Sequence, residues 1–171
     1  MSQNELIDII DENNIVIGVI PRSLSYERGI SHRIVHVMVI DKNKIYLVQR
    51  ADSVRYLPGF FCTSAGGHVL AGETSEAAAL RELEEEIGLH GPLDLFREFF
   101  FEHEFKVHVS LFIKRFQSDS DRIVLNPSEV KCGNFYSKDE TQDLDRRLFH
   151  PQLTPCLKMV LESGSAIAKG F

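Results

Sequence analysis

Short apolar runs separated by polar turns recur along the chain, and this pattern predicts a structure with many β-strands. Residues 6–10 and 15–20 are β-branched runs on either side of a polar cluster at residues 11–14. We therefore expect an N-terminal hairpin over about residues 5–21. The stretch that follows, residues 21–29, is interpreted as a polar connector.

Three later segments also have the pattern of strands. Residues 32–40 carry apolar side chains on both faces, as strands do when both faces of the sheet are covered. Residues 45–50 form a second apolar run after a turn. Residues 107–115 alternate apolar and polar side chains, which predicts a strand with one less buried face. Layers are therefore expected above and below the sheet.

The clearest helix spans residues 74–89, with Thr74 or Ser75 as the N-cap and Gly88 at the C-terminal end. A second helix is expected over residues 154–163, with Pro155 at its first position. Strands with helices on two sides predict an α/β fold, a sandwich with a mixed sheet between helices.

Length and composition narrow the class of protein. A chain of 171 residues corresponds to about one domain, and 43% hydrophobic with 26% charged residues is typical of globular proteins. No apolar run approaches the roughly 20 residues that span a bilayer, and the first residues lack the pattern of a secretory leader. The sequence therefore predicts a cytoplasmic protein with no membrane partner.

Charge and cysteine content exclude further classes. The net charge of −6 argues against a nucleic-acid-binding protein, which needs a broad basic face. Cys62, Cys132 and Cys156 lie far apart and form no C-x-x-C pair, which disfavours a zinc ribbon and a disulfide scaffold. They are expected to be buried, reduced thiols.

The predicted helix at residues 74–89 divides into an apolar and an acidic face. The apolar stripe is formed by Ala77, Leu80, Leu83 and Ile87. The opposite face is formed by Glu82, Glu85 and Glu86. Like charges three or four residues apart on a helix repel by about 0.2–0.5 kcal/mol per pair, so a bound cation explains the cluster better than solvation does. Carboxylates without cysteine favour Mg²⁺ or Mn²⁺.

A glycine turn lies just before this helix. Gly66 and Gly67 precede His68 and allow the backbone to approach a metal ion or a phosphate closely. Gly72 and Glu73 then lead into the helix. We expect the loop and the helix to form one site.

These residues together resemble a complete Nudix box at residues 67–89. Gly67, five residues, Glu73, seven residues and then the run RELEEEIGL from Arg81 to Leu89 fill every position that the motif specifies. The flanking strands and the final helix also lie where the Nudix fold would place them. The resemblance implies a single Nudix hydrolase domain over residues 1–171.

The resemblance also implies roles for named residues. The metal ligands would be the Gly67 carbonyl, Glu82, Glu85 and Glu86. Arg81 would orient the carboxylates, and Glu73 would pair with its guanidinium. The family reaction is metal-dependent hydrolysis of a nucleoside diphosphate linked to another moiety.

The general base differs between members of the family, and two candidates stay open. One is Glu82, and the other is Glu129, in a polar loop after the helix. Arg50, Arg55 and Phe60 border the loop before the box and are expected to contact the substrate. The partner is therefore expected to be a small-molecule diphosphate, and a homodimer is left open.

Within the superfamily the chain is similar to the branch that contains isopentenyl-diphosphate isomerase. The isomerases place a catalytic cysteine where this chain has Gly66, and Cys62 lies four residues earlier, so isomerisation is the disfavoured alternative. His32 and His68 match positions of a second metal in the isomerases, and hydrogen-bonded structural histidines are the other interpretation. A third alternative is a non-catalytic Nudix module that senses a nucleotide. The sequence does not identify the physiological substrate.

Overall fold

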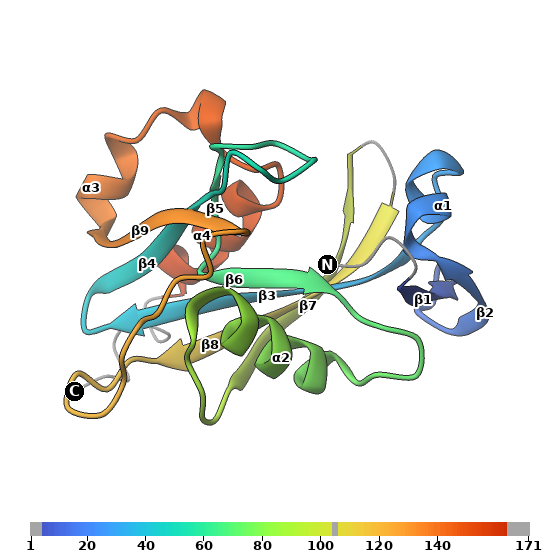
Figure 1. The fold of residues 1–171 in the computed structure, drawn as a ribbon, viewed down its shortest axis with the longest axis horizontal. Coiled ribbons are helices and arrows are strands. Elements are labelled where there is room, and N and C mark those ends of the chain that lie inside the picture. The colour runs from blue at the N-terminus through green and yellow to red at the C-terminus, as the bar shows by residue number, and fades with distance from the viewer. Residues whose placement is uncertain (1–4, 104–105, 164–171) are drawn as a thin grey trace.

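A computed structural model describes residues 5–103 and 106–163. Its main sheet consists of β3 (His32–Asp41), β4 (Lys44–Arg50), β5 (Phe61–Cys62), β6 (Ala65–His68), β7 (Asp94–Glu102), β8 (Lys106–Arg115) and β9 (Val130–Ser137). The strand order is β5-β4-β3-β8-β7, with β6 paired to β3 and β9 to β4 (Figure 1). β3 and β8 are parallel and the other pairs are antiparallel, so the sheet is mixed.

Helices cover both faces of this sheet (Figure 1). Val35, Val37 and Val39 of β3 pack in one apolar cluster with α2 (Ser75–Ile87). Met38 and Ile40 of the same strand pack in a second cluster with α4 (Leu153–Glu162). The predicted α/β/α arrangement is confirmed, because β3 is apolar on both faces and each face meets a different helix.

The N-terminal hairpin is present. β1 (Leu6–Ile10) and β2 (Val16–Pro21) pair antiparallel as a separate two-stranded sheet. The interpretation of residues 21–29 as a connector was wrong, because α1 (Arg22–Glu27) follows β2 directly. This helix is only six residues long and buries Ser25 alone, so it has no apolar stripe that a periodicity argument could detect.

Two further expectations need correction. Both faces of β8 are buried, and its polar residues have partners nearer the surface: Lys114 pairs with Asp121 at 2.9 Å, and Ser110 donates a hydrogen bond to the exposed Glu98. α4 begins at Leu153, so Pro155 is its third residue rather than its first. Proline is still tolerated there, because the N–H groups of the first helical turn have no partner within the helix.

Helix α2 has the predicted ends but a different buried face. Thr74 caps it by accepting a hydrogen bond from the Ala77 N–H, and Gly88 ends it at φ 68°. Ala77 and Leu80, predicted in the apolar stripe, are exposed. The buried residues are Ala78, Ala79, Glu82, Leu83, Glu86 and Ile87. The helix is therefore rotated so that two glutamates, rather than two apolar residues, face the sheet.

The remaining described elements are a short helix α3 (Lys138–Gln142) and a single 3-10 turn η1 (Arg146–Leu148), which lead from β9 to α4. No helix within residues 5–103 and 106–163 is both long enough and apolar enough to cross a bilayer.

Candidate active site

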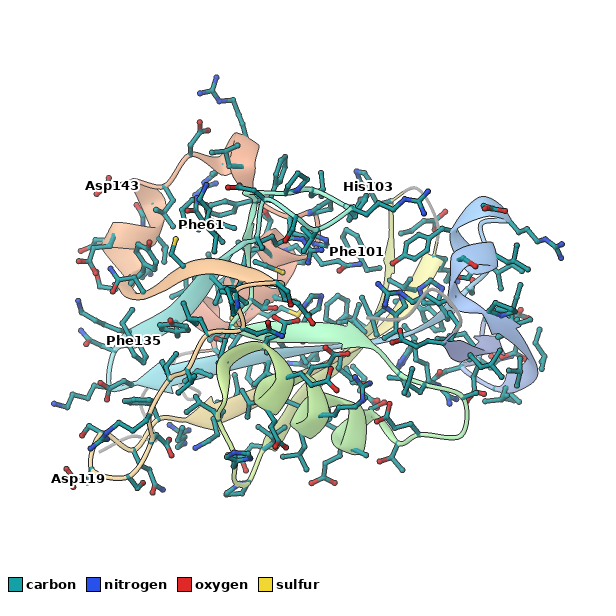
Figure 2. The ribbon with its side chains drawn as sticks, viewed as in Figure 1. Phe61, Phe101, His103, Asp119, Phe135 and Asp143 are labelled. Carbon is teal, nitrogen blue, oxygen red and sulfur yellow. The ribbon has the colours of Figure 1, made fainter. Side chains whose placement is uncertain are left out.

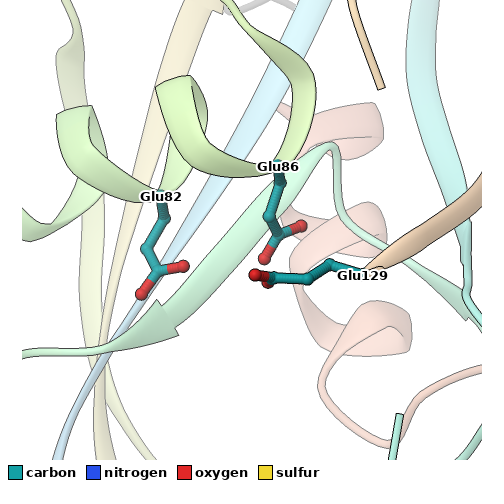
Figure 3. Close-up of side chains that lie close together, drawn as sticks. All are labelled: Glu82, Glu86 and Glu129. Carbon is teal, nitrogen blue, oxygen red and sulfur yellow. The ribbon is translucent and has the colours of Figure 1, made fainter. Parts of the chain in front are cut away.

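Three carboxylates converge beside β6 (Figure 3). Glu82 and Glu86 lie one turn apart on α2, and Glu129 comes from the loop just before β9. One carboxylate oxygen of each residue lies within 4.8 Å of those of the other two. Glu82 and Glu86 are buried and Glu129 is half-buried. We call this group the glutamate cluster.

The loop that carries Glu129 is fixed to the C-terminal end of α2. The Asn126 N–H donates to the Glu86 carbonyl at 2.9 Å, and the Val124 N–H donates to the Ile87 carbonyl at 2.9 Å. These bonds satisfy carbonyls that the last turn of a helix leaves without partners. On its other side, the Glu129 carbonyl accepts a hydrogen bond from Ala51 at 2.8 Å. The C-terminal end of α2 thus holds Glu129, which is distant in the sequence, beside the carboxylates of Glu82 and Glu86.

Gly67 lies directly beneath the carboxylate of Glu82. A Cβ atom at residue 67 would overlap that carboxylate. Glycine is needed here because of the close approach rather than because of a special backbone angle. The close approach brings the backbone of β6 to the edge of the glutamate cluster.

Arg81 holds the acidic groups on one side of the cluster. Its Nε and Nη2 atoms each lie 3.0 Å from an oxygen of Glu73, which is a bidentate pair, and its Nη1 donates to Glu82 at 2.7 Å. Nη2 also donates to the His68 carbonyl at 3.0 Å. The predicted contact between Arg81 and Glu73 is confirmed, and one guanidinium fixes both a helix carboxylate and the preceding loop.

Burial makes the ionised glutamates costly without a cation. Burial, together with the repulsion of nearby carboxylates, raises the pKa of Glu82 to about 7 and the pKa of Glu86 well above its ordinary value. The buried Oε2 atom of Glu82 has no hydrogen-bond partner among the residues that the structure describes. An oxygen-only donor set of this kind fits a divalent cation, which would favour the charged forms.

Glu85, which the resemblance also makes a metal ligand, lies at the edge of the cluster. Its side chain is 45% exposed, and its carboxylate is 3.7 Å from Arg81 Nη1. Glu129, proposed from sequence as a general base, occupies the third position among the converging carboxylates. The position of Glu85 leaves its role as a ligand a prediction.

A cavity of about 670 Å³ opens beside the glutamate cluster and is lined in part by Glu86, Glu129 and Gly67. Arg50 and Arg55 line it as expected, whereas Phe60 is not among the described residues that do. The Arg50 Nε donates to the Tyr56 carbonyl at 3.0 Å. Its two terminal nitrogens make no hydrogen bond or ion pair within the described part of the chain, so they remain available to an anion.

Sequence reasoning missed much of the cavity wall. The wall also contains Tyr26 of α1, Phe101 and His103 at the end of β7 (Figure 2), and His150 and Gln152 before α4. These residues come from elements far apart in the chain and carry no shared motif. Only the folded arrangement of the hairpin, the sheet edge and the C-terminal segment shows that they border one space.

Four histidines of the wall, His32, His36, His68 and His150, have pKa values that burial lowers. Burial lowers the pKa of His36 to about 4 and that of His150 to about 3. His32 and His68 stack with ring centroids 5.1 Å apart, and each ring makes a hydrogen bond: His32 Nδ1 to the Ile30 carbonyl and His68 Nε2 to the Tyr26 hydroxyl. Neither histidine is part of the group of converging ligand atoms, which comes from Glu82, Glu86 and Glu129.

Position 66 and the cysteines bear on the isomerase alternative. A Cβ atom at Gly66 would lie 2.6 Å from the Val35 carbonyl oxygen and 2.7 Å from His36 Nδ1, so no side chain fits there without a backbone shift. Cys62 lines the cavity, but burial raises the pKa of its thiol. Cys156 is buried as expected, whereas Cys132 is exposed, which corrects that prediction.

Comparison with known proteins agrees with this geometry. The model of the NUDIX domain family matches residues 30–157. Over 91 residues the chain is 40% identical to an uncharacterised Nudix hydrolase of Streptomyces coelicolor, an alignment that covers 53% of this chain and 50% of that protein. The chain spans about half the length of the curated relatives it matches.

Solved structures show the same fold. DR0079 from Deinococcus radiodurans has a TM-score of 0.70 at 22% identity and covers 80% of this chain and 86% of its own. The NUDIX domain of Shewanella oneidensis NrtR, solved with ADP ribose, has a TM-score of 0.63 at 13% identity, with coverages of 77% and 86%. The family model spans most of the chain, including the glutamates of α2, and the chain therefore belongs to the NUDIX domain family.

Proposed function

We propose that the protein is a divalent-metal-dependent pyrophosphohydrolase that cleaves a diphosphate linkage in a nucleoside diphosphate derivative or a related small diphosphate. The observation that carries the proposal is the convergence of Glu82, Glu86 and Glu129 beside a large cavity that Glu86 and Glu129 line. A protein that only used these residues for solubility would not bury two of them, since burial makes their charged forms costly.

The metal is proposed to be Mg²⁺ or Mn²⁺, held by the glutamate cluster with the Gly67 carbonyl and Glu85 as further ligands. When bound, such an ion supplies charge neutralisation at the diphosphate and makes a water molecule more acidic. The chain's own contribution is to fix the carboxylates. Arg81 donates to Glu82 through Nη1, while its Nε and Nη2 atoms are bound by Glu73. Because the guanidinium is fixed by Glu73, the carboxylate of Glu82 keeps one orientation.

Arg50 is proposed to bind the phosphate groups. Its guanidinium lies in the cavity wall and is oriented by the Tyr56 carbonyl, and its two terminal nitrogens, which have no hydrogen-bond partner among residues 5–103 and 106–163, match phosphate oxygens. Arg55 also lines the cavity and adds a second positive charge for the same anion. Together they supply the attraction that the acidic cluster alone cannot offer to a diphosphate.

Either Glu82 or Glu129 can serve as the general base that takes a proton from water. Glu82 is buried and bound to Arg81, whereas Glu129 is half-buried on a loop and faces the cavity. The base should be separable from the ligands by the pH–rate profile. Substituting the base with glutamine should remove the acidic limb of the profile, whereas substituting a ligand should raise the metal concentration that gives half-maximal activity.

The proposal is tested by a screen on nucleoside triphosphates, dinucleotides, nucleotide sugars and non-nucleotide diphosphates, in which phosphorus NMR follows the loss of the diphosphate and the appearance of monophosphate or pyrophosphate products. Each substrate is incubated with Mg²⁺, with Mn²⁺ and with EDTA, and Glu86→Gln serves as the matched inactive variant. At least one substrate should be cleaved with metal and not in EDTA. Equal turnover in EDTA, or no turnover of any substrate with either metal, would contradict the proposal.

A nucleotide-sensing module without turnover is the second candidate. It is favoured by one observation, that a NUDIX domain of similar fold, from Shewanella oneidensis NrtR, was solved with ADP ribose. Calorimetry with ADP ribose and Mg²⁺ distinguishes the two. Tight binding with no hydrolysis product after prolonged incubation supports sensing, whereas release of AMP and ribose phosphate supports the hydrolase. A cytoplasmic location stays a prediction, and a homodimer stays an open alternative.

A further inference from the structure

Residues 67–74, which run from the last two residues of β6 to the N-cap of α2 and which we call the metal-binding loop, include the Gly67 backbone of the proposed metal site and are held from two sides. On one side, Arg81 and Glu73 of the Nudix box bind it through the His68 carbonyl and the Leu70 N–H. On the other side lies the N-terminal unit, which we define as residues 5–27 and which contains β1, β2 and α1. This unit precedes the residues that the family model matches.

The N-terminal unit contacts the loop through an isolated β-bridge between Ile7 and Leu70 and through the following hydrogen bonds. The Leu6 carbonyl accepts a hydrogen bond from the Ala71 N–H at 2.8 Å. The buried carboxylate of Asp8 accepts one from the Gly72 N–H at 3.3 Å. The Tyr26 hydroxyl lies 2.8 Å from His68 Nε2. The first two hydrogen bonds hold the far end of the loop, and the third holds the residue next to Gly67.

Tyr26 reaches His68 from the wall of the substrate cavity. Its ring lies edge-on to His32 and His68, with centroids 5.9 and 5.6 Å away, and both histidines are buried. The His68 carbonyl meanwhile accepts from Arg81. His68 is therefore the point where the two supports meet, one residue from the glycine that lies beneath Glu82.

We propose that the N-terminal unit positions the metal-binding loop, and that the Tyr26 hydroxyl is the group through which it does so. This inference rests on the proposed function. Tyr26 acts through His68 and is a positioning residue rather than a catalytic one. The backbone bond from Ala71 to Leu6 keeps the unit docked when the hydroxyl is removed, so its loss should loosen the Gly67 end of the loop without undocking the unit.

The test is an isothermal calorimetric titration of the metal-free protein of residues 1–171 with Mn²⁺, for the parent and for Tyr26→Phe. Phenylalanine keeps the ring contacts and removes the hydroxyl that lies 2.8 Å from His68 Nε2. The dissociation constant for Mn²⁺ should rise roughly five-fold, the change that corresponds to a hydrogen bond of about 1 kcal/mol. Tyr136→Phe, the same chemical change on β9 outside the cavity, should leave the constant unchanged.

A double-mutant cycle separates positioning from a general loss of packing. His68→Phe removes the same hydrogen bond and keeps a ring against His32, so the double variant should bind Mn²⁺ about as weakly as either single variant. Additive losses would overturn the inference, as would an unchanged constant in Tyr26→Phe when the parent binds Mn²⁺. If the parent binds no Mn²⁺, the proposed function itself fails, and the inference fails with it.

Discussion

The carboxylate of Glu82 lies so close over Gly67 that a Cβ atom there would overlap it. Gly67→Ala should therefore displace the carboxylate and lower hydrolysis by a factor on the order of a hundred, because a misplaced ligand loses several kcal/mol of charge stabilisation. Gly18→Ala is the matched control, since a Cβ at residue 18 meets Ile9 at 3.4 Å, an ordinary contact. Equal activity of Gly67→Ala and the parent would show that Glu82 does not need this position.

The bidentate pair between Arg81 and Glu73 predicts that a positive charge at residue 81 is not sufficient for full activity. Arg81→Lys keeps the positive charge but cannot bind Glu73, Glu82 and the His68 carbonyl together, so activity should fall at least ten-fold. Arg147→Lys, which changes an exposed arginine paired with Asp145, should have no effect. A fully active Arg81→Lys variant would reduce the role of Arg81 to a general positive charge.

The buried glutamates predict an unusual pH dependence in EDTA. Burial raises the pKa of Glu86 well above its ordinary value of 4.5. Above pH 4.5 the unfolded chain therefore loses the Glu86 proton while the folded protein keeps it. The free energy of unfolding consequently falls as the pH rises. Glu86→Gln lacks this group. Its melting temperature should therefore gain on the parent's between about pH 6 and pH 8. If the melting temperature of Glu86→Gln instead fell relative to that of the parent as the pH rose, a buried partner would have to stabilise the charged carboxylate of Glu86.

Bound metal should reverse the order of stability that the parent and Glu86→Gln have in EDTA. Added Mg²⁺ should raise the melting temperature of the parent more than that of Glu86→Gln, as expected of a ligand that binds only the folded protein. Glu86→Gln should lower hydrolysis about a hundred-fold or more, and Glu85→Gln should lower it less, because Glu85 lies at the exposed edge of the cluster. Equal losses in the two variants would place Glu85 inside the metal site.

Position 66 predicts that isopentenyl diphosphate is not isomerised. Gly66→Cys should not create the activity either, because its Cβ would meet the Val35 carbonyl and His36, and the variant should melt below the parent. Proton NMR of isopentenyl diphosphate incubated with each protein checks this. Dimethylallyl diphosphate formed by the parent and lost in Cys62→Ser would show that Cys62 replaces the missing thiol.

The sequence predicted the parts of the fold whose pattern is local. β3 was recognisable because it is apolar on both faces, and α2 because its cap and its glycine end are encoded in single residues. α1 was missed because six residues carry no usable period. β8 was expected to be half exposed because its polar residues look solvated until Asp121 and Glu98 are seen beside them.

The candidate site shows the same limit. The Nudix box identified Glu82, Glu86 and Arg81, but the apolar stripe of α2 was misplaced, because the polarity rule assumes that glutamates avoid the interior. Glu129 could be suspected from sequence but not placed, since its position depends on hydrogen bonds from Asn126 and Val124 to the end of α2. The Tyr26 contact depends on docking of the hairpin and left no signal in the sequence.

The most direct test of metal binding by the glutamate cluster is a crystal of the protein of residues 1–171 grown with Mn²⁺, with anomalous diffraction recorded near the manganese absorption edge. We expect an anomalous peak between the carboxylates of Glu82, Glu86 and Glu129, and no peak there in a Glu86→Gln crystal grown in the same way. Manganese bound elsewhere on the parent, with no peak among these three carboxylates, would contradict metal binding by the cluster.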